Sequence, residues 1–225
     1  CYAVRVPYRL LYRLRERDMK LQDYRRQYTL GGLSRDNLPA DPLELFQQWQ
    51  AEANAAGLAD PTGVVLATQQ PDGQMRQRFV LLKGCDDRGF IFFTNYNSDK
   101  AVAMNSNRQV SLLFPWNELD RQVSISGTAK KLPAAESDAY FASRPRASQL
   151  SAWASNQSQS IASRALLEAQ LDEVRARFEG GSVPRPEDWG GYVVNPSRIE
   201  FWQGGSDRLH DRFAYTITDG WKLER

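Results

Sequence analysis

The sequence has few of the residues that build metal and disulfide centres. Its 225 residues include one histidine, His210, and two cysteines, Cys1 and Cys85, which lie far apart and form no CxxC motif. A site with several histidines and a four-cysteine zinc site are therefore excluded, and we expect no metal. A disulfide framework is not expected either. Such cysteine usage is typical of a reducing cytoplasm, which is where we expect the protein to be located.

Long apolar runs and a strong charge of one sign are also missing. No run approaches the roughly 20 apolar residues of a membrane-spanning helix, so we expect no membrane association. The formal net charge of +2 gives no overall field that would favour nucleic acid. No GxGxxG or GxxxxGK[ST] motif follows a predicted strand, which argues against a Rossmann or P-loop site. Any anion site must therefore be a local cluster.

What the sequence does contain is a succession of short strand patterns. Pro71-Asp72-Gly73 joins two of them into a predicted hairpin. The predicted strands cover residues 62–70, 74–83, 89–94, 108–116, 119–132, 189–195, 198–203 and 208–217, with a last one from Trp221. Helices are predicted from Asp41-Pro42 through Trp49, over 98–104, after Pro133, and over 163–178 with the stripe Leu167, Leu171, Val174 and Phe178 as core. This order favours a mainly β, antiparallel barrel or sandwich with peripheral helices.

Three potential cations stand close together near the end of the chain. Side chains alternate along a strand, so Arg208, His210 and Arg212 would share one face of the predicted strand 208–217. Cations side by side repel one another unless they are solvated or face an anion. A solvated outer face is one interpretation. A flat anionic ligand is the other, and Phe201 and Trp202 in the preceding strand favour it.

Three further clusters of polar residues are candidate anion sites. They are Arg76, Arg78 and Lys83 in the predicted hairpin, Tyr140 with RPRAS at 144–148, and Gln157-Ser158. The second cluster, with two arginines and two hydroxyls, is able to clamp a phosphate. Each cluster also has a plain interpretation. The first would be a solvated hairpin, the second a loop at a helix end, and the third a polar loop. Cations among aromatic residues also occur in RNA-binding sheets, but the near-neutral net charge argues against a nucleic acid partner.

Several stretches, in order from about Tyr24 to the end, resemble the pyridoxamine 5′-phosphate oxidase family. They are RFVLLK at 78–83, YFASRPRASQ at 140–149, WGGY at 189–192 and EFWQGGSDRLHDR at 200–212, with YRRQYTLGGL at 24–33 and Asp41-Pro42 in support. The resemblance implies a Greek-key-like split β-barrel that binds FMN as a homodimer, with the flavin at the subunit interface. It also implies an oxidase that converts pyridoxamine or pyridoxine 5′-phosphate and oxygen to pyridoxal 5′-phosphate and hydrogen peroxide. The reaction would proceed by hydride transfer to flavin N5 and would release ammonia from the amine.

The same resemblance implies roles for individual residues. The flavin contacts would be Arg78, Phe79, Val80, Leu81, Leu82, Lys83, Phe93, Thr94, Lys100, Gln122, Gln157, Ser158, Trp202 and Arg212. The substrate contacts would be Arg25, Tyr28, Lys83, Tyr140, Arg144, Ser148, Arg208, Leu209 and His210. Among them, Arg208 and His210 would be the catalytic pair above the pyridine ring.

The sequence also departs from the family at a few positions. Asp99 stands where family members commonly have arginine, and its carboxylate would repel the flavin phosphate. Phe93 stands where tyrosine is common. Three alternatives stay open: a flavin reductase built on the same barrel, a carrier of flavin or pyridoxal phosphate without turnover, of which Asp99 would be a sign, and an RNA-binding barrel.

The chain is expected to have three parts. We interpret residues 1–18 as a disordered extension translated from upstream of a start at Met19. Residues 19–40, with Arg25 and Tyr28, resemble a segment that closes over the substrate. Residues 41–225 are expected to form a single FMN-binding split-barrel domain.

Overall fold

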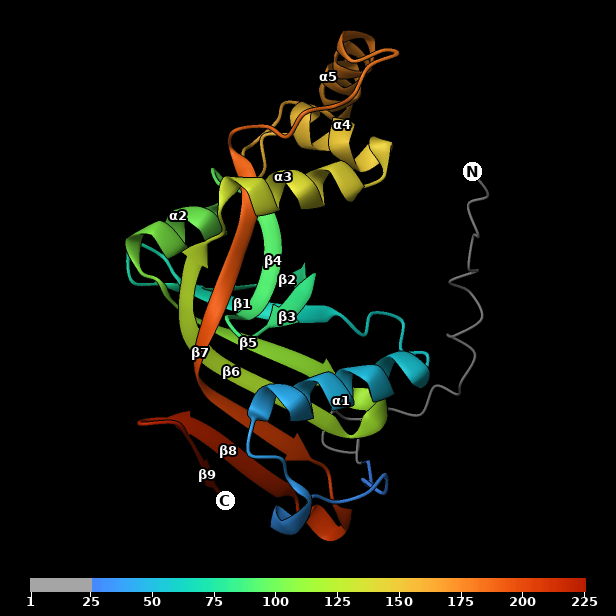
Figure 1. The fold of residues 1–225 in the computed structure, drawn as a ribbon. Helices are drawn as coiled ribbons and strands as arrows, with labels where there is room; N and C mark the ends of the chain where they lie inside the picture. The colour runs from blue at the N-terminus through green and yellow to red at the C-terminus, as the bar shows by residue number, and fades with distance from the viewer. Residues whose placement is uncertain (1–25) are drawn as a thin grey trace, which may run out of the picture.

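The computed structural model describes residues 26–225, so the expected extension 1–18 and the substrate residue Arg25 lie outside the described residues. Nine antiparallel strands form one sheet in the order β2-β1-β5-β6-β7-β4-β3, with β8 paired to β7 and β9 to β8 (Figure 1). The strands are β1 (Gly63–Gln69), β2 (Met75–Leu81), β3 (Gly84–Asp86), β4 (Gly89–Asn95), β5 (Gln109–Trp116), β6 (Arg121–Lys131), β7 (Trp189–Gln203), β8 (Asp211–Ile217) and β9 (Trp221–Glu224). The predicted mainly β fold with peripheral helices is confirmed.

The helices lie around this sheet. They are α1 (Pro42–Ala55), α2 (Asp99–Ser106), α3 (Ala134–Ser143), α4 (Arg146–Ala154) and α5 (Arg164–Arg177), with the 3-10 turns η2 (Arg35–Asn37), η3 (Asn117–Leu119) and η4 (Ser206–Arg208). Figure 1 shows α3, α4 and α5 together at one end of the molecule, and β8 and β9 at the other. The long strand β7 runs between the two ends.

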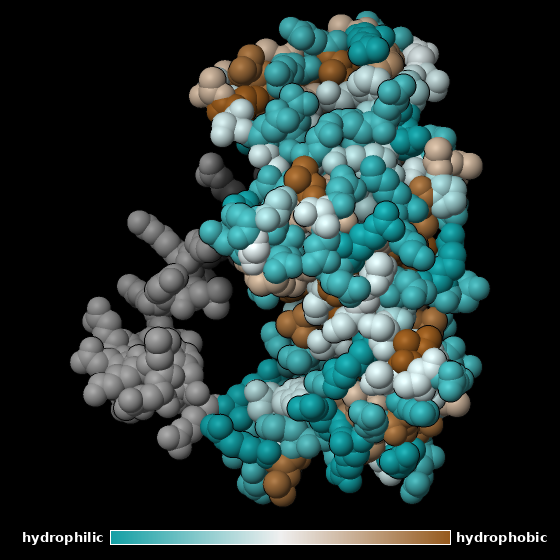
Figure 2. Space-filling view, turned by 90° about the vertical axis from the view of Figure 1, so that its left-hand side faces the viewer, coloured by the Kyte–Doolittle hydropathy of each residue, from teal (hydrophilic) through white to brown (hydrophobic). Residues whose placement is uncertain are grey.

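The core fills the space inside the curved sheet and under α1. Helix α1 begins at Pro42, where the Asp41 side chain accepts a hydrogen bond from the Leu43 amide at 2.9 Å. One turn on, the fully buried Phe46 meets the rings of Phe90 and Phe114 at 4.8 and 4.9 Å. The face drawn in Figure 2 is mostly hydrophilic, with separate small hydrophobic patches. Apolar burial therefore holds the barrel together and leaves polar side chains outside.

The structure corrects the prediction that a single strand begins at residue 208. The chain leaves β7 after Gln203, forms the turn η4, and enters β8 only at Asp211. Asp207 and Arg208 have φ angles of 55° and 65°, a left-handed conformation that no strand contains. Arg208 and His210 therefore lie in a connection, and the predicted common strand face of Arg208, His210 and Arg212 is wrong.

Other boundaries also differ from the predicted ones. The strands predicted at 189–195 and 198–203 are one strand, β7, with a register shift opposite Ser126 and Gly127 that accommodates Pro196. Residues 146–148, whose plain interpretation was a loop at a helix end, instead begin helix α4, and β3 was missed. Helix α5 has no fully buried residue and takes no part in the main core, but Leu171, Val174 and Phe178 of its stripe pack against a second, small hydrophobic core. The members of that core are Phe141, Leu150, Val183 and Trp189.

Candidate active site

A cavity of about 550 Å³ opens between strands β2 and β4 and helices α3 and α4. Four residues predicted to contact the substrate line it, Lys83, Tyr140, Arg144 and Ser148. Residues predicted to contact the flavin line it as well, namely Phe79, Val80, Leu81, Phe93, Thr94, Lys100 and Gln157. The fold thus brings residues from distant parts of the sequence to one cavity.

Stacked aromatic rings form one wall of this cavity. Phe93 stacks on Tyr140 with ring centroids 3.8 Å apart and on Trp189 at 5.5 Å. Gly191 makes this packing possible, because a Cβ atom there would come within 2.8 Å of the Phe93 ring. The wall is flat and apolar, as an aromatic ligand requires.

Arg144 is the most unusual charged group of the wall. Its Cζ atom lies 4.7 Å from the centre of the Trp189 ring, and its Nη1 atom is buried without a hydrogen-bond partner among residues 26–225. Burial lowers the pKa of the Arg144 guanidinium and raises the pKa of the neighbouring Tyr140 hydroxyl. A buried cationic donor that lacks a partner is unfavourable, so Arg144 favours an anion in this cavity.

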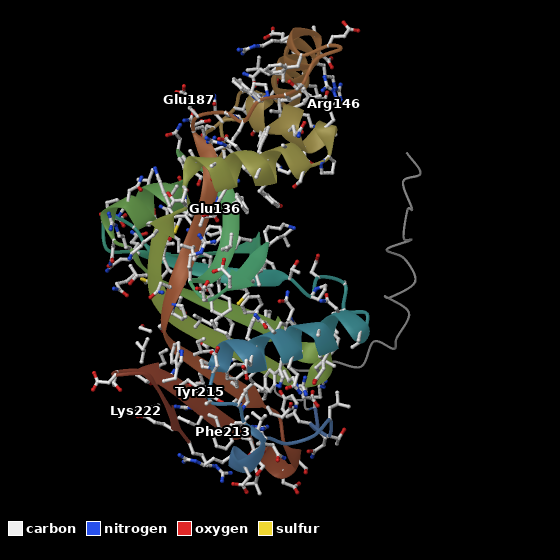
Figure 3. All side chains as sticks on the ribbon, in the orientation of Figure 1. Glu136, Arg146, Glu187, Phe213, Tyr215 and Lys222 are labelled. Carbon is white, nitrogen blue, oxygen red and sulfur yellow. The ribbon has the colours of Figure 1, made fainter. Side chains whose placement is uncertain are left out.

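Arg146 does not join Arg144, although the sequence placed both in one phosphate clamp. Its guanidinium donates to the carbonyl of Gly181 at 2.7 Å and to that of Phe178 at 2.5 Å, just beyond helix α5. Figure 3 shows Arg146 at the outer end of the molecule, with the α4 and α5 helices. The predicted clamp therefore contains one arginine, and Arg146 holds two structural elements together.

A second cavity, of about 510 Å³, adjoins the first and shares Phe79, Lys100 and Gln157 with it. Its charged and polar lining consists of Arg76, Gln77, Arg78, Asp99, Lys100, Gln157 and Ser158. The Lys100 ammonium donates to Thr94 Oγ1 at 3.1 Å, and that hydroxyl donates to Gln157 Oε1 at 2.9 Å. Burial, together with the nearby Arg78, lowers the pKa of Lys100 to about 8.

Asp99 is the only carboxylate among the residues that line this second cavity. It pairs with Arg76, with Nη1 and Oδ2 3.2 Å apart, and both side chains are about half exposed. Arg78 instead donates to the Leu66 carbonyl and to Thr68 Oγ1, at 3.1 and 2.8 Å. The second cavity therefore gathers three cations, Arg76, Arg78 and Lys100, and the charge of Asp99 is paired with that of Arg76.

Leu82 differs from its neighbours in the stretch 78–83. Its side chain is buried in the main core, and its amide donates to the Thr62 carbonyl at 2.9 Å. Phe79 and Leu81 are exposed and line the first cavity. Leu82 follows the last residue of β2, where its side chain enters the core, while Phe79 and Leu81 stay at the cavity.

A second group of predicted residues gathers where β7 meets β8. Gln122, Trp202 and Arg212 form one row across β6, β7 and β8. The ring of His210 lies 4.7 Å from that of Trp202, and its Nδ1 atom accepts a hydrogen bond from the Gly205 amide at 3.1 Å. Three further predicted residues lie near this row: Tyr28, whose ring is edge-on to Trp202, and Arg208 and Leu209, which precede His210 in the chain. Leu209 is 81% exposed. We call this set the β7–β8 cluster: Tyr28, Gln122, Trp202, Arg208, Leu209, His210 and Arg212.

The two cavities and the β7–β8 cluster are separate within one chain. None of the residues of the cluster lines either cavity. In Figure 1 the helices α3 and α4 beside the first cavity and the strand β8 lie at opposite ends of β7. One described chain thus presents the two halves of the predicted site on different parts of its surface.

Known proteins match nearly the whole chain. A family model described as pyridoxamine 5′-phosphate oxidase matches residues 50–178, and one for a pyridoxine 5′-phosphate oxidase C-terminal dimerisation region matches residues 189–225. The chain belongs to the pyridoxamine 5′-phosphate oxidase family. Membership in this family makes it an oxidoreductase and supports the expected cofactor, FMN.

Two curated members of the pyridoxamine 5′-phosphate oxidase family show how far the similarity extends. The pyridoxine/pyridoxamine 5′-phosphate oxidase of Shewanella frigidimarina is 52% identical over 206 residues, which is 91% of this chain and 97% of that protein. The protein of the same name from Teredinibacter turnerae is 52% identical over 208 residues, 92% of this chain and 99% of its own length. The similarity therefore spans the barrel and both parts of the candidate site.

Solved structures show the same fold. PhzG from Burkholderia lata, in complex with tetrahydrophenazine-1-carboxylic acid, has a TM-score of 0.80 and 34% identity, covering 84% of this chain and 93% of that chain. A pyridoxamine 5′-phosphate oxidase-related, FMN-binding protein from Nostoc punctiforme has a TM-score of 0.66 at 15% identity. The match covers 83% of this chain and 98% of that chain. These likenesses confirm the predicted split barrel. In residues 26–225, no helix has the length and apolar character for a membrane span.

Proposed function

We propose that this protein is an FMN-dependent oxidase that converts pyridoxamine or pyridoxine 5′-phosphate and oxygen to pyridoxal 5′-phosphate and hydrogen peroxide, with ammonia from the amine. The observation that carries the proposal is the pair of adjoining cavities, each with its own cations. Two phosphorylated, flat molecules need two such anion sites and a flat apolar surface between them. The names of relatives at 52% identity support the same reaction.

The residues present suit FMN. Arg78, Lys100 and Ser158 would hold its phosphate in the second cavity, where Lys100 is a buried cation without a carboxylate partner in residues 26–225. Thr94 and Gln157, which bond to each other, would fix the ring system beside the apolar residues of β2. When bound, FMN supplies the two-electron acceptor that no side chain provides, and oxygen takes the electrons on to hydrogen peroxide.

The substrate would occupy the first cavity. Lys83, Arg144 and Ser148 would bind its phosphate, and the aromatic wall would exclude water from the reacting carbon. Because Nδ1 of His210 accepts the Gly205 amide, the neutral imidazole carries its proton on Nε2 and presents a donor there. Arg208 would add a fixed positive charge above the ring, and His210 would move or hold the proton.

This arrangement requires two copies of the chain. The matched dimerisation region, residues 189–225, contains most of the β7–β8 cluster. We therefore propose a homodimer in which the cavities of one chain face the β7–β8 cluster of its partner. Exposed apolar side chains along β2, such as Phe79 at 62% exposure, would be covered in that dimer.

The direct test is to purify the protein, record its visible spectrum, and add pyridoxine 5′-phosphate under air. A yellow protein that forms pyridoxal 5′-phosphate and peroxide in equal amounts is the expected result. A yellow protein that consumes reduced nicotinamide and ignores the substrate would instead be a flavin reductase. A protein that binds either ligand without turnover would be a carrier.

The affinity for FMN is expected to fall as the pH rises through about 8. The pKa of Lys100 is lowered to about 8 in the free protein, so its ammonium is charged below that pH and neutral above it. Only the charged form attracts a phosphate. The Kd is expected to be about tenfold higher at about pH 9.5 than at about pH 7, measured by quenching of flavin fluorescence. Lys100→Gln should bind FMN more weakly and lose this pH dependence. If the FMN affinity of this variant fell with rising pH as much as that of the wild type, another group would be the one that titrates.

Asp99→Asn is expected to tighten FMN binding. The substitution removes the one carboxylate of the second cavity and releases Arg76 toward the phosphate. Since both side chains are half exposed, we expect a modest gain of about two- to fivefold in affinity. Riboflavin, which has no phosphate, is the control ligand, and its affinity should not change. A gain for riboflavin equal to that for FMN would contradict an effect on the phosphate.

A further inference from the structure

Asp120 binds the N-terminal strap, which we define as residues 26–33. Asp120 ends the turn η3 in a left-handed conformation, with φ 54° and ψ 32°, and its side chain is 2% exposed. Its carboxylate accepts a hydrogen bond from the Arg26 guanidinium and another from the Thr29 amide, the latter at 3.2 Å. A buried carboxylate is stable only where donors satisfy it, so these bonds fix the strap to the barrel.

The backbone carbonyl of the same residue holds the end of β7. It accepts the Gly204 amide at 2.7 Å and Nε2 of Gln203 at 3.2 Å. Trp202, a member of the β7–β8 cluster, is the next residue back along that strand. Asp120 therefore bonds with its side chain to the strap and with its backbone to the strand that carries the cluster.

Tyr28 lies where these two connections meet. Its ring is edge-on to Trp202 at 5.6 Å and to His210 at 5.4 Å. Gly204 leaves room for it, because a Cβ atom there would come within 2.7 Å of Tyr28 Cγ. Arg26, the partner of Asp120, has its Cζ atom 5.6 Å from the same ring. Any shift of the strap against β7 would therefore move Tyr28 off His210.

We propose that Asp120 is a positioning residue of the active site, which fixes the strap so that Tyr28 packs on Trp202 and His210 and covers the substrate. The inference rests on the proposed function, in which Tyr28 and His210 contact the substrate. Without the carboxylate, the strap opens and substrate binding weakens. Arg208 and His210 stay in place for the chemical step, so KM changes more than kcat.

The left-handed backbone of Asp120 allows two clean substitutions. Asparagine and glycine both adopt this conformation readily, so Asp120→Asn and Asp120→Gly keep the turn. Asparagine retains an acceptor for the Thr29 amide and loses the charge that faces Arg26, whereas glycine loses both. Arg26→Gln removes the same contact from its exposed side. Glu118→Gln is the matched control, because this exposed carboxylate of the same turn has no ion pair within residues 26–225.

Two readouts on the FMN-loaded enzyme test the proposal. The first is the rate of limited tryptic cleavage at the Arg26–Gln27 bond, which needs no turnover. The second is the separation of KM from kcat with pyridoxine 5′-phosphate. We expect Asp120→Gly to raise both the cleavage rate and KM about tenfold, with kcat changed less than about twofold, and Glu118→Gln to change neither. Thermal unfolding and flavin content verify that each variant is folded.

Two results would overturn the proposal. One is a wild-type cleavage rate and KM in Asp120→Asn together with a wild-type KM in Arg26→Gln, which has lost the tryptic site and is tested by KM alone; both variants remain informative if the glycine variant does not fold. The other is additivity, because two residues that act through one contact must show less than the sum of their effects when both are replaced. Failure of the proposed function would look different, since the wild-type enzyme would then lack turnover while its Arg26–Gln27 bond stayed protected.

Discussion

Arg144→Ala is expected to lower kcat/KM for pyridoxine 5′-phosphate by about a hundredfold or more. The guanidinium is held over Trp189, and its Nη1 atom has no partner in the described part of the chain, so its donors are free for a ligand. Charge-assisted hydrogen bonds to an anion contribute roughly 1.5–3 kcal/mol each, and an arginine makes two of them to one phosphate. Steady-state kinetics across substrate concentrations measures the loss, which should lie mainly in KM.

Arg146→Ala is the matched control, two residues further along the chain. Its guanidinium already donates to the Gly181 and Phe178 carbonyls, so its loss should lower thermal stability and leave kcat/KM near the wild-type value. Unphosphorylated pyridoxine is the control substrate, because it cannot use the bonds that Arg144 supplies. Equal losses for pyridoxine and its phosphate would show that Arg144 acts on the fold of the cavity and not on the phosphate.

Features set by local sequence could be predicted without the structure. The hairpin around Pro71-Asp72-Gly73 and the start of α1 at Pro42 follow from turn and capping residues that act on their immediate neighbours. Strand β5 was predicted almost to the residue, at 108–116, and its burial alternates at every position, as expected of a strand with one buried face. The likeness of RFVLLK and YFASRPRASQ to a family then identified residues that the fold brings to one cavity.

Features that depend on contacts between distant segments could not be predicted. Arg146 looked equivalent to Arg144, and only the packing of α5 beside α4 shows that its donors are used elsewhere. The left-handed turn at Asp207 and Arg208 breaks a strand pattern that looked continuous. Asp120 carries no motif, and its role depends on segments 26–29 and 203–204 that are far apart in sequence. A pattern reports neighbours along the chain, whereas these contacts arise from the fold.

The separation of the two halves of the site leads to the prediction with the most distinctive outcome. Arg144→Ala alters the cavity, and Arg208→Ala alters the β7–β8 cluster, which lies elsewhere on the same chain. Arg208 is exposed in its turn, so its replacement should lower turnover by about a hundredfold without loss of stability. If each site combines a cavity from one chain with the cluster of its partner, a mixed dimer contains one doubly altered site and one intact site.

Coexpression of the two variants should therefore restore activity that neither has alone. Random pairing makes half of the dimers mixed, and half of the sites in those dimers are intact, so about one quarter of wild-type activity is expected. Two affinity tags allow the mixed dimer to be isolated, and its activity should reach about one half. Arg144→Ala coexpressed with Tyr140→Phe is the control, because both changes lie in the cavity half and leave no intact site. If the mixed dimer of Arg144→Ala and Arg208→Ala shows only the average of its two parents, each chain has a complete site of its own and the shared site is wrong.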